Sequence, residues 1–598
     1  MGLLETIRTP ADVKKLRVEQ LNIFAREIRE RIVSVTYDHG GHLSSNLGTV
    51  DLIVALYYVF DFPEDKLVFD VGHQSYAHKI LSGRNDRFDT IRQKGGLSGF
   101  PFPAESEYDV FCAGHAGNSV SACLGLCASR DALGEDYNVI DVVGDASLFN
   151  GENLEALTSG DKKPKKFIVI VNDNGMSISV NDNGLYKFFT RIASKKSYGR
   201  AMAFAERTIG QKWIGRQLKK MKRSFKIRLN KTAVIDSVGL KYVGIFDGHD
   251  IRSLVRLLTD LKDSNSAILL HLKTTKGKGM AEAEKNAGYY HGVGSRFRSS
   301  ENTFSAEAGR LLCAAAETDE KLAVICAGMK DGTGLSSFAE KFPDRFYDVG
   351  IAEEHAVTFA AGMSKGGLHP VVCIYSTFLQ RSFDQIMHDV CLPGLPVTFF
   401  VDRAGVVGAD GATHQGLFDL SYLTCIPGLK VFAPVDREDM ALVFDYARTL
   451  GVPCAIRYPN GSFGESVPHD PLSVRLWDGD DVTGKDNVIL AVGARMFRLA
   501  KKVAEETGKS VAVVNARLVS DLDEELLNAI GGKNIVTMEE NVEKGGFGSA
   551  VALRYAKEGR RVRLKIFAFP EKFVFHGTVN EQLAEAGFTE ENIAGSLV

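Results

Sequence analysis

The runs VIDVVGDAS (139–147) and KFIVIVNDNGMSIS (166–179) decide the fold of this chain. Each begins as a mostly apolar stretch and then passes into Gly, Asp or Asn. A short stretch that is apolar on both faces is typical of a strand in a parallel sheet covered by helices. The two runs are roughly 30 residues apart, the length of one strand-helix-strand crossover. They predict an α/β fold in which both strands end at the same edge of a parallel sheet.

The same pattern recurs in three groups along the chain, and each group indicates a sheet of its own. Polar joints near 296–305 and 464–473 separate the groups. We predict three consecutive parallel-sheet α/β domains, over residues 1–300, 301–470 and 471–598. The further strands expected are AILLHLKT (267–274) in the first domain, AVICAG (323–328), PVVCIYS (370–376), PVTFFVD (396–402) and LKVFAP (429–434) in the second, and NVILAVG (487–493), SVAVVNAR (510–517), NIVTMEE (534–540) and VRLKIFAF (562–569) in the third.

Composition places the chain among globular proteins and argues against nucleic-acid and membrane partners. Of its 598 residues, 44% are hydrophobic and 25% are charged, and a net charge of −3 gives no general attraction to nucleic acid or to a membrane. No apolar stretch approaches the ~18 residues of a membrane span, and the charged N-terminus is unlike a signal peptide. The nine cysteines lack zinc-binding spacing and suit a reducing compartment. We expect a cytoplasmic protein without nucleic-acid or membrane partners.

Residues 187–231 depart from this balance, with fifteen Lys and Arg against a single acidic residue, Glu206. Two interpretations stay open. We favour a solvated helical excursion, because no nucleic-acid-binding motif accompanies the charges. The alternative is a basic lid or a site for an anionic partner.

Polar side chains follow the first two strands. Asp145 comes after one strand, and Asn172, Asp173 and Asn174 close the other. Ligands bind at the carboxyl ends of parallel strands, and Mg²⁺ prefers hard oxygen donors such as a carboxylate, an amide oxygen and a backbone carbonyl. The spacing alone fits equally well two unrelated turns in which Asp and Asn hydrogen-bond the backbone.

Motifs over nearly the whole chain favour the first of these interpretations. The GD…NDN pair resembles the metal and diphosphate signature of thiamine diphosphate enzymes, and the surrounding motifs resemble the 1-deoxy-D-xylulose-5-phosphate synthases, a transketolase-like family. The matching motifs are GGHLSSNLGTVDLIVALYYVF (40–60), FDVGHQSYAHKILSGR (69–84), IRQKGGLSGFP (91–101), SEYDVF (106–111), DGHD (247–250), KGKG (276–279), VGIAEEHAVTFAAG (349–362), YSTFLQRSFDQ (375–385), DRAGVVGADGATHQGLFD (402–419), RYPNG (457–461) and EKGGFGSAV (543–551).

The resemblance implies a transferase that condenses pyruvate, with loss of CO₂, and D-glyceraldehyde 3-phosphate to 1-deoxy-D-xylulose 5-phosphate. This reaction is the first step of non-mevalonate isoprenoid synthesis and also feeds thiamine synthesis. The cofactors implied are thiamine diphosphate and Mg²⁺. The family also implies a homodimer in which each active site lies between the first and second domains of one chain.

The resemblance assigns cofactor-binding residues as well. Glu353, in GIAEEHA, matches the glutamate that hydrogen-bonds the aminopyrimidine N1′, an acid–base role that favours a dry pocket and a raised pKa. Phe378 matches the aromatic residue that packs on the pyrimidine ring. The expected metal ligands are Asp145, Asn174 and the carbonyl of Met176. Further cofactor contacts are expected from His73, Gly114, His115, Ala116, Ala146, Ser147, Asn174 and Met280.

Cationic and imidazole side chains are expected to handle the substrates. Arg403 and Arg457 match family residues that hold the phosphate, because a guanidinium can bind two oxygens at once. Arg381 and Tyr375 are further substrate-binding candidates. The residues expected to line the reaction centre, where they would transfer protons or recognise hydroxyl groups, are His42, His291, Asp410 and His414.

Several positions depart from the family pattern. Ala146 replaces a Gly beside the diphosphate, Met280 replaces an aromatic residue, and Asn460 replaces an Arg in RYPNG. An alanine is tolerable at position 146 only if its φ angle is negative. Two alternatives follow: a divergent transketolase-like enzyme with another donor or acceptor, and a non-catalytic thiamine diphosphate-binding paralogue. A pyruvate requirement with CO₂ release would separate the synthase from a transketolase that takes its two-carbon unit from a ketose, and cofactor binding without turnover would indicate the paralogue.

Overall fold

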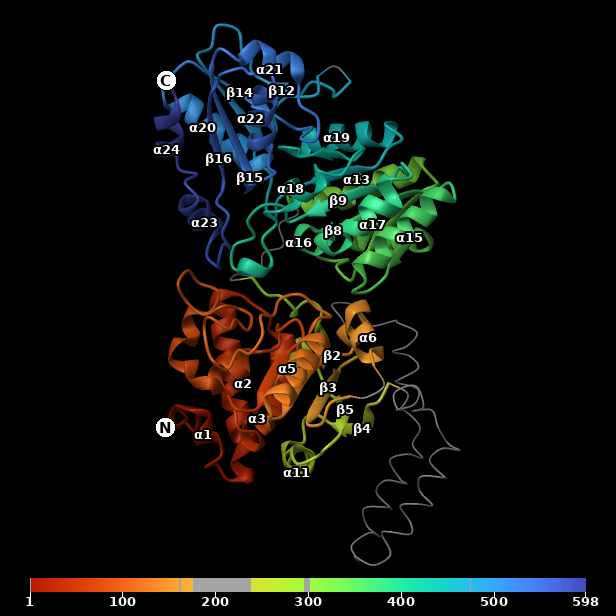
Figure 1. Ribbon diagram of the computed structural model, residues 1–598, viewed down its shortest axis with the longest axis vertical. Coiled ribbons are helices and arrows are strands. Elements are labelled where there is room, and N and C mark those ends of the chain that lie inside the picture. Colours follow the sequence, from red (N-terminus) through yellow and green to blue (C-terminus); the bar gives the residue numbers. More distant parts are fainter. Residues whose placement is uncertain (1, 161–162, 176–237, 295–301, 474) are drawn as a thin grey trace, which may run out of the picture. The chain divides into compact units, whose positions relative to one another are not determined.

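The computed structural model describes residues 2–160, 163–175, 238–294, 302–473 and 475–598 (Figure 1). The basic segment 187–231 lies outside the described residues. The chain divides into two compact units: unit 1 comprises residues 1–91 and 97–297, and unit 2 comprises residues 92–96 and 298–598. The short segment 92–96 belongs to unit 2, although its sequence neighbours on both sides belong to unit 1.

Unit 1 is built on one parallel sheet with the strand order β1-β2-β3-β5-β4. Successive side chains of a strand point to opposite sides of the sheet, and in the inner strands the side chains on both sides are apolar. Ile168 and Ile170 face one hydrophobic cluster, and Phe167 and Val169 face another. The strands are β1 (Lys66–Phe69), β2 (Val139–Gly144), β3 (Phe167–Asp173), β4 (Lys241–Asp247) and β5 (Ala267–Lys273).

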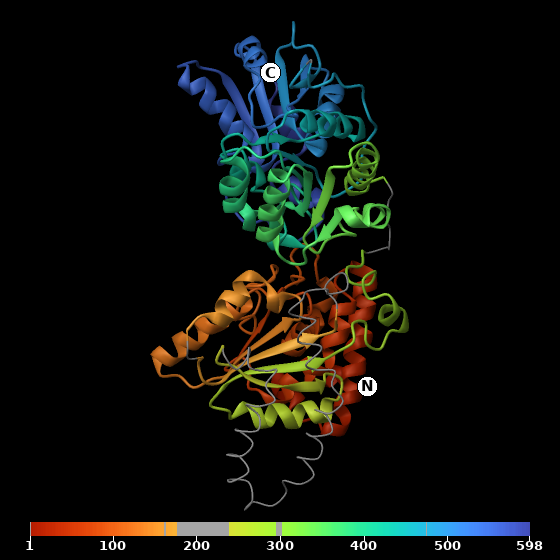
Figure 2. The same ribbon diagram turned by 90° about the vertical axis from the view of Figure 1, so that its right-hand side faces the viewer.

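Helices cover both faces of this sheet, with α2 and α3 on one side and α5 on the other (Figure 2). α3 has only one charged residue, Asp51, and 14 of its 16 residues are buried. It contacts α2 and α11. The helices are α1 (Pro10–Val13), α2 (Leu21–His39), α3 (Ser44–Val59), α4 (Tyr76–Lys79), α5 (Ser119–Leu133), α6 (Gly151–Thr158), α11 (Ile251–Lys262) and α12 (Ala281–Lys285).

Unit 2 holds two sheets, and the first is fully parallel in the order β10-β11-β9-β8-β6-β7. Its strands are β6 (Leu322–Cys326), β7 (Phe346–Asp348), β8 (His369–Tyr375), β9 (Thr398–Asp402), β10 (Lys430–Phe432) and β11 (Cys454–Arg457). Its helices are α13 (Phe304–Thr318), α14 (Ser336–Lys341), α15 (Glu353–Lys365), α16 (Ser376–Leu379), α17 (Phe383–Gln385), α18 (Asp419–Leu423) and α19 (Arg437–Thr449).

The second sheet of unit 2 has the order β12-β14-β13-β15-β16, and β12 alone among these five strands is antiparallel. One hydrophobic cluster runs through both sheets, so they pack as one body. The strands are β12 (Asp478–Gly479), β13 (Asn487–Val492), β14 (Val511–Asn515), β15 (Asn534–Val542) and β16 (Arg563–Phe569). The helices are α20 (Ala494–Glu506), α21 (Glu524–Ile530), α22 (Phe547–Lys557), α23 (Val579–Glu585) and α24 (Glu590–Ser596).

The predicted fold class is confirmed, and every strand predicted by its apolar run is present. The apolar runs did not predict β1, β4, β7, β11 and β12. β1, β7, β11 and β12 are at most four residues long, and β4 is a partly exposed edge strand, so none of these five forms a long apolar run. The three domain boundaries stay predictions. Among the described residues, no helix is long and apolar enough to cross a membrane.

Candidate active site

Two strand ends of unit 1 bring predicted metal ligands to one edge of the sheet. β2 and β3 pair in parallel with Gly144 in register with Asn172, so Asp145 and Asn174 follow neighbouring strand ends. Asp145 is 2% exposed. Met176 lies outside the described residues. The described part of the set, one carboxylate and one amide, has the oxygen donors that Mg²⁺ accepts.

The other polar residues at the end of β3 are bonded to β5 and the residues after it. Thr274 donates to Oδ1 of Asn172 (2.5 Å), and Asp173 pairs with His271 (2.9 Å) and with Lys273 (3.1 Å). These contacts tie the ends of the two strands together. Among the described residues, no group of three His, Cys, Asp or Glu side chains could hold a metal ion. The predicted Mg²⁺ ligands include only one side chain of these four types.

Asp70 and Asn153 join two turns of unit 1 that carry predicted cofactor contacts. Asp70 is fully buried after β1 and accepts hydrogen bonds from the Gly117 backbone N–H (3.0 Å) and from Nδ2 of Asn153 (3.1 Å). The same Nδ2 donates to the Ser147 carbonyl (2.9 Å). Sequence reasoning missed both side chains. The predicted contacts in the two turns that they join are Gly114, His115 and Ala116 in one, and Ala146 and Ser147 in the other.

Local backbone geometry explains which substitutions these turns accept. Ala146 has a φ of −74°, so the methyl group that departs from the family pattern causes no backbone strain. Gly117 has a φ of +92°, and a Cβ there would lie 2.1 Å from Oδ1 of Asn150. Met280 precedes α12 and packs, partly buried, against the apolar cluster that includes α2 and α3. It therefore keeps an apolar contact without a ring.

Three predicted histidines of unit 1 cluster together. The ring centroids of His42, His73 and His291 lie 5.3–5.8 Å apart. Burial, reinforced by the neighbouring imidazoles and by Lys276, lowers the pKa of His73 and of His291 well below the usual range, so both are neutral at pH 7. Burial also lowers the pKa of Lys276 to about 8, against the opposing effect of Asp145. The KGKG motif pointed to this segment, but Lys276 was not predicted as a site residue.

Glu353 is the first residue of α15 and is 3% exposed. Burial raises the pKa of Glu353 to about 7, although the guanidinium of Arg381, 3.8 Å from Oε2, opposes the shift. The buried Oε2 accepts no hydrogen bond from any described residue. This carboxyl group is poised near neutrality with one oxygen available to share a proton.

Aromatic rings surround Phe378 in α16. Its ring stacks on Tyr375 at the end of β8, with centroids 5.9 Å apart and an interplanar angle of 21°, and meets His414 edge-on at 5.6 Å. The guanidinium carbon of Arg403 lies 3.9 Å from the centroid of the Tyr375 ring. Unit 2 therefore brings four predicted site residues into one group.

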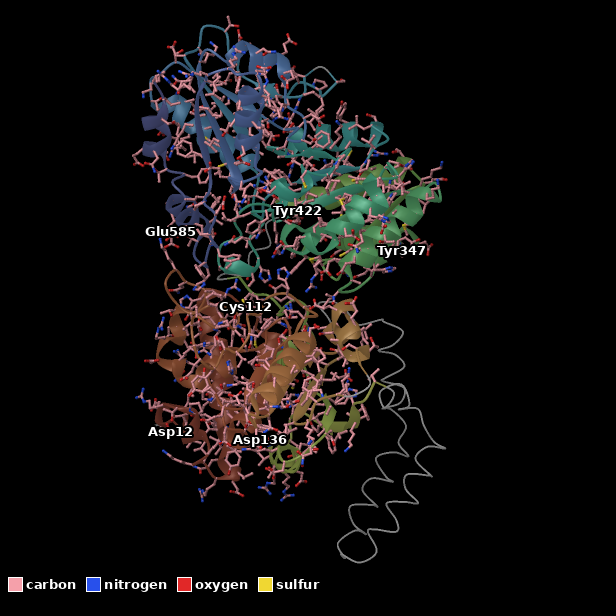
Figure 3. All side chains as sticks on the ribbon, viewed as in Figure 1. Asp12, Cys112, Asp136, Tyr347, Tyr422 and Glu585 are labelled. Atoms are coloured by element: carbon pink, nitrogen blue, oxygen red, sulfur yellow. The ribbon has the colours of Figure 1, made fainter. Side chains whose placement is uncertain are left out.

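Two further contacts fix the start of α16 and the side chain of Asp410. Tyr422 of α18, labelled in Figure 3, donates to the Ser376 carbonyl at the start of α16 (3.4 Å). Asp410 forms an ion pair with Arg92 (2.7 Å), which belongs to the segment 92–96 of unit 2. The carboxylate of Asp410 is thus anchored by a residue from a distant part of the sequence.

The two arginines predicted to hold the phosphate differ in their surroundings. Arg457 is buried, and its Nε donates to Asp419 Oδ2 (3.0 Å) while its Nη2 donates to the Glu540 carbonyl (3.2 Å). The buried Nε of Arg403 makes no hydrogen bond to any described residue. Arg403 therefore has a donor available for a ligand, whereas two nitrogens of Arg457 are committed to protein groups. The roles predicted for both arginines, as for the other site residues, stay predictions.

Three known domain families match the chain in order. Residues 4–274 match the family described as 1-deoxy-D-xylulose-5-phosphate synthase, residues 301–464 match the pyrimidine-binding domain of transketolase, and residues 480–593 match the transketolase C-terminal domain. A solved transketolase from Campylobacter jejuni aligns with 97% of this chain and 99% of its own, at 17% identity and a TM-score of 0.43.

Relatives named 1-deoxy-D-xylulose-5-phosphate synthase match the chain from end to end. The Clostridium perfringens protein is 41% identical over 617 residues, which cover 100% of this chain and 99% of its own. The Carboxydothermus hydrogenoformans protein is 43% identical over 610 residues, covering 99% and 98%. The Dehalococcoides mccartyi protein is 44% identical over 610 residues, covering 99% and 96%. This chain belongs to the 1-deoxy-D-xylulose-5-phosphate synthase family of transketolase-like enzymes.

Proposed function

We propose that this chain condenses pyruvate with D-glyceraldehyde 3-phosphate to form 1-deoxy-D-xylulose 5-phosphate and CO₂. The bond between the carboxyl carbon and the carbonyl carbon of pyruvate breaks, and that carbonyl carbon bonds to the aldehyde carbon of the acceptor. One proton is taken up, so atoms and charge balance. The observation that carries the proposal is the buried Glu353 with its unbonded Oε2, in a chain of this family.

Thiamine diphosphate, when bound, supplies a thiazolium carbon that stabilises the negative charge left as pyruvate loses CO₂. Glu353 fits this cofactor, because a carboxyl group with a pKa of about 7 can share a proton with a ring nitrogen at neutral pH. The ring of Phe378 offers a flat apolar surface to the pyrimidine. The buried Nδ1 of His73 has no hydrogen-bond partner among the described residues. Because burial keeps the imidazole neutral, His73 can hydrogen-bond to the cofactor without adding a positive charge.

The diphosphate end of the cofactor would be held in unit 1. Asp145 and Asn174 supply a carboxylate and an amide oxygen for Mg²⁺, with the carbonyl of Met176 as the third predicted ligand. Lys276 adds a positive charge near Asp145, which suits an anionic group there. The negative φ of Ala146 supports cofactor binding despite the departure from the family pattern.

The remaining predicted residues would handle the substrates. Arg403 would bind the acceptor phosphate through its Nε, which makes no hydrogen bond to any described residue, and Arg381 would bind a substrate anion beside Glu353. His291 is neutral at pH 7 and can accept or donate a proton. His42, Asp410 and His414 are the other groups proposed to transfer protons or recognise hydroxyl groups.

We further propose that the protein is a cytoplasmic homodimer. The family resemblance supports the dimer, and the nine cysteines, all of them free thiols, support a reducing compartment. Sedimentation equilibrium of the full chain tests the assembly. A mass of one chain at micromolar concentration would refute the dimer.

The test of the reaction is CO₂ release from labelled pyruvate by the purified chain with thiamine diphosphate and Mg²⁺, with and without D-glyceraldehyde 3-phosphate. Release should rise with the acceptor, yield a five-carbon deoxyketose phosphate, and vanish in Glu353→Ala. Turnover of a ketose phosphate donor without CO₂ would indicate a transketolase reaction instead. Bound cofactor without turnover of either donor would indicate a binding protein.

A further inference from the structure

The turn that carries Arg403 has an unusual backbone. Arg403 has a φ of +59°, a conformation that residues other than Gly rarely adopt. Such a backbone persists only where surrounding contacts enforce it. Some of these contacts lie within the first sheet layer of unit 2: the Ala404 N–H donates to the Tyr458 carbonyl (3.0 Å), and Gly405 and Gly416 exchange two hydrogen bonds of 2.7 Å.

The second sheet of unit 2 supplies the remaining contacts through two charged side chains. Oε1 of Glu540, in β15, accepts from the Val406 N–H (3.3 Å) and from Nη1 of Arg495 (2.7 Å). Nη1 of Arg495, in α20, also donates to the Val406 carbonyl (3.0 Å), and its Nη2 donates to the Asn460 carbonyl (2.6 Å). Both side chains are largely buried, at 7% and 12% exposure for Glu540 and Arg495. They fix the backbone N–H and the backbone carbonyl of Val406, three residues after Arg403.

The same part of β15 reaches the second predicted phosphate residue. The backbone carbonyl of Glu540 accepts from Nη2 of Arg457, and β15 lies beside α18, which carries Asp419, the carboxylate partner of Arg457 (Figure 1). Glu540 therefore contacts the turn of Arg403 with its side chain and Arg457 with its backbone. A single residue of the second sheet therefore contacts both the turn of Arg403 and the guanidinium of Arg457.

We propose that Arg495 and Glu540 are positioning residues that fix the turn 403–406, and with it Arg403, for the phosphate group of the acceptor. The inference rests on the proposed function. Charge-assisted hydrogen bonds in a nearly dry environment hold a geometry more strictly than neutral contacts do. A shift of the turn would move the guanidinium away from the phosphate but would leave the carbon atoms of the acceptor free to react. The second sheet thus sets specificity for a phosphorylated acceptor.

The test compares a phosphorylated acceptor with its unphosphorylated counterpart. For the full-length holoenzyme at saturating pyruvate, kcat/KM is measured with D-glyceraldehyde 3-phosphate and with D-glyceraldehyde. The ratio of the two values reports phosphate recognition. We expect Arg495→Gln to lower this ratio by about 10-fold or more through KM, since small misplacements cost about that much. Arg495→Lys, which keeps the charge but loses the fork, and Glu540→Gln should lower it less.

Arg498→Gln is the matched control. It removes the same charge from the same helix, and its guanidinium donates to the Ser462 carbonyl (3.4 Å) rather than to the turn. Its ratio should equal that of the wild type, whereas Arg403→Gln should show the largest loss. If Arg495→Gln fails to fold by circular dichroism, the Arg495→Lys and Glu540→Gln variants give the result.

Several outcomes would overturn the proposal. One is an unchanged ratio in Arg495→Gln, and another is an equal fall of kcat/KM for both acceptors, which marks a merely structural role. An unchanged ratio in Arg403→Gln would also overturn it, because Arg403 would then not bind the phosphate group of the acceptor. If the wild type releases no CO₂ with either acceptor, the proposed function itself fails, and the inference falls with it.

Discussion

Glu353 and His469 are both buried titratable groups of unit 2, yet their environments act on them in opposite ways. Glu353 has no hydrogen bond to Oε2, and burial raises its pKa to about 7, so it loses its charge readily. Burial alone would lower the pKa of His469, but hydrogen bonds to Asp436 and Asp478 outweigh it and raise the pKa to about 10. One group is kept close to neutral, and the other is kept charged.

The location of each group explains the difference. We call His469, Asp436 and Asp478 the clasp. Asp436 caps α19 of the first sheet layer, Asp478 lies in β12 of the second sheet, and the imidazole between them is 2% exposed. A buried charge with two partners ties two layers together, whereas a buried carboxyl group with an available oxygen is suited to proton exchange. The two groups differ in their hydrogen bonds: both nitrogens of His469 are bonded to carboxylates, whereas Oε2 of Glu353 accepts no hydrogen bond from any described residue.

The largest effect should come from replacing Glu353. Glu353→Gln keeps the shape of the side chain but cannot exchange a proton, so kcat for 1-deoxy-D-xylulose 5-phosphate formation should fall by about 10²–10⁴-fold. Steady-state kinetics at saturating thiamine diphosphate measure this change. Activity within a factor of about 10 of the wild type would show that the buried carboxyl group is not the proton-exchanging one.

Removing the imidazole of the clasp should lower the stability of the protein and leave kcat unchanged. His469→Ala leaves two buried carboxylates without their shared cation, which should lower the free energy of unfolding by about 3–5 kcal/mol at pH 6. Chemical denaturation followed by circular dichroism measures it. His388→Ala is the control, because His388 is exposed with one carboxylate partner, and it should change little. Loss of kcat per folded molecule in His469→Ala would contradict the structural role.

The pH dependence of that difference sharpens the contrast. The pKa of His469 in the folded state, about 10, lies above its usual value of 6.5, so protonation favours the folded state. The stabilisation by the clasp should be complete below pH 6.5 and should disappear as the pH rises toward 10. A difference between wild type and His469→Ala that stays constant from pH 6 to pH 10 would refute a charged imidazole.

Glu353 should show the opposite sign in a stability measurement. Its pKa rises from 4.5 to about 7 on folding, so ionisation disfavours the folded state and stability falls as the pH rises through this window. In the absence of cofactor, Glu353→Gln should therefore be more stable than the wild type at pH 8, by up to about 3 kcal/mol. At pH 4 the two proteins should be alike. An equal difference at both pH values would point to packing as the cause.

The smallest effect should be found at Ala146, which carries no charge and gives a baseline for the comparison. Its φ of −74° is already favourable, so Ala146→Gly should not improve cofactor binding. The added backbone freedom should lower the free energy of unfolding by less than about 1 kcal/mol. Titration calorimetry with thiamine diphosphate and Mg²⁺ measures the affinity. A large gain in affinity would show that the methyl group obstructs the diphosphate.

Much of the fold could be predicted from sequence, because apolar strands of a parallel sheet stand out against polar turns. The run that became β3 begins one residue before the observed strand, whereas the four residues of β1 were missed because a short run carries little periodic signal. Motifs led to Glu353 and Phe378. They did not reveal Asp70, Asn153 or Arg495, because these act through contacts with residues far away in the chain.

The sequence by itself determined the fold class and the family, since strand periodicity and ordered motifs are local properties of the chain. The tertiary structure decided which charges are paired. Arg403 and Arg457 looked equivalent in their motifs, yet one keeps a donor available and the other is bonded to Asp419. Likewise, only the packed protein shows that Glu353 is buried with an unbonded oxygen. Electrostatic energies depend on burial and on distances across the fold, and spacing along the sequence does not encode either.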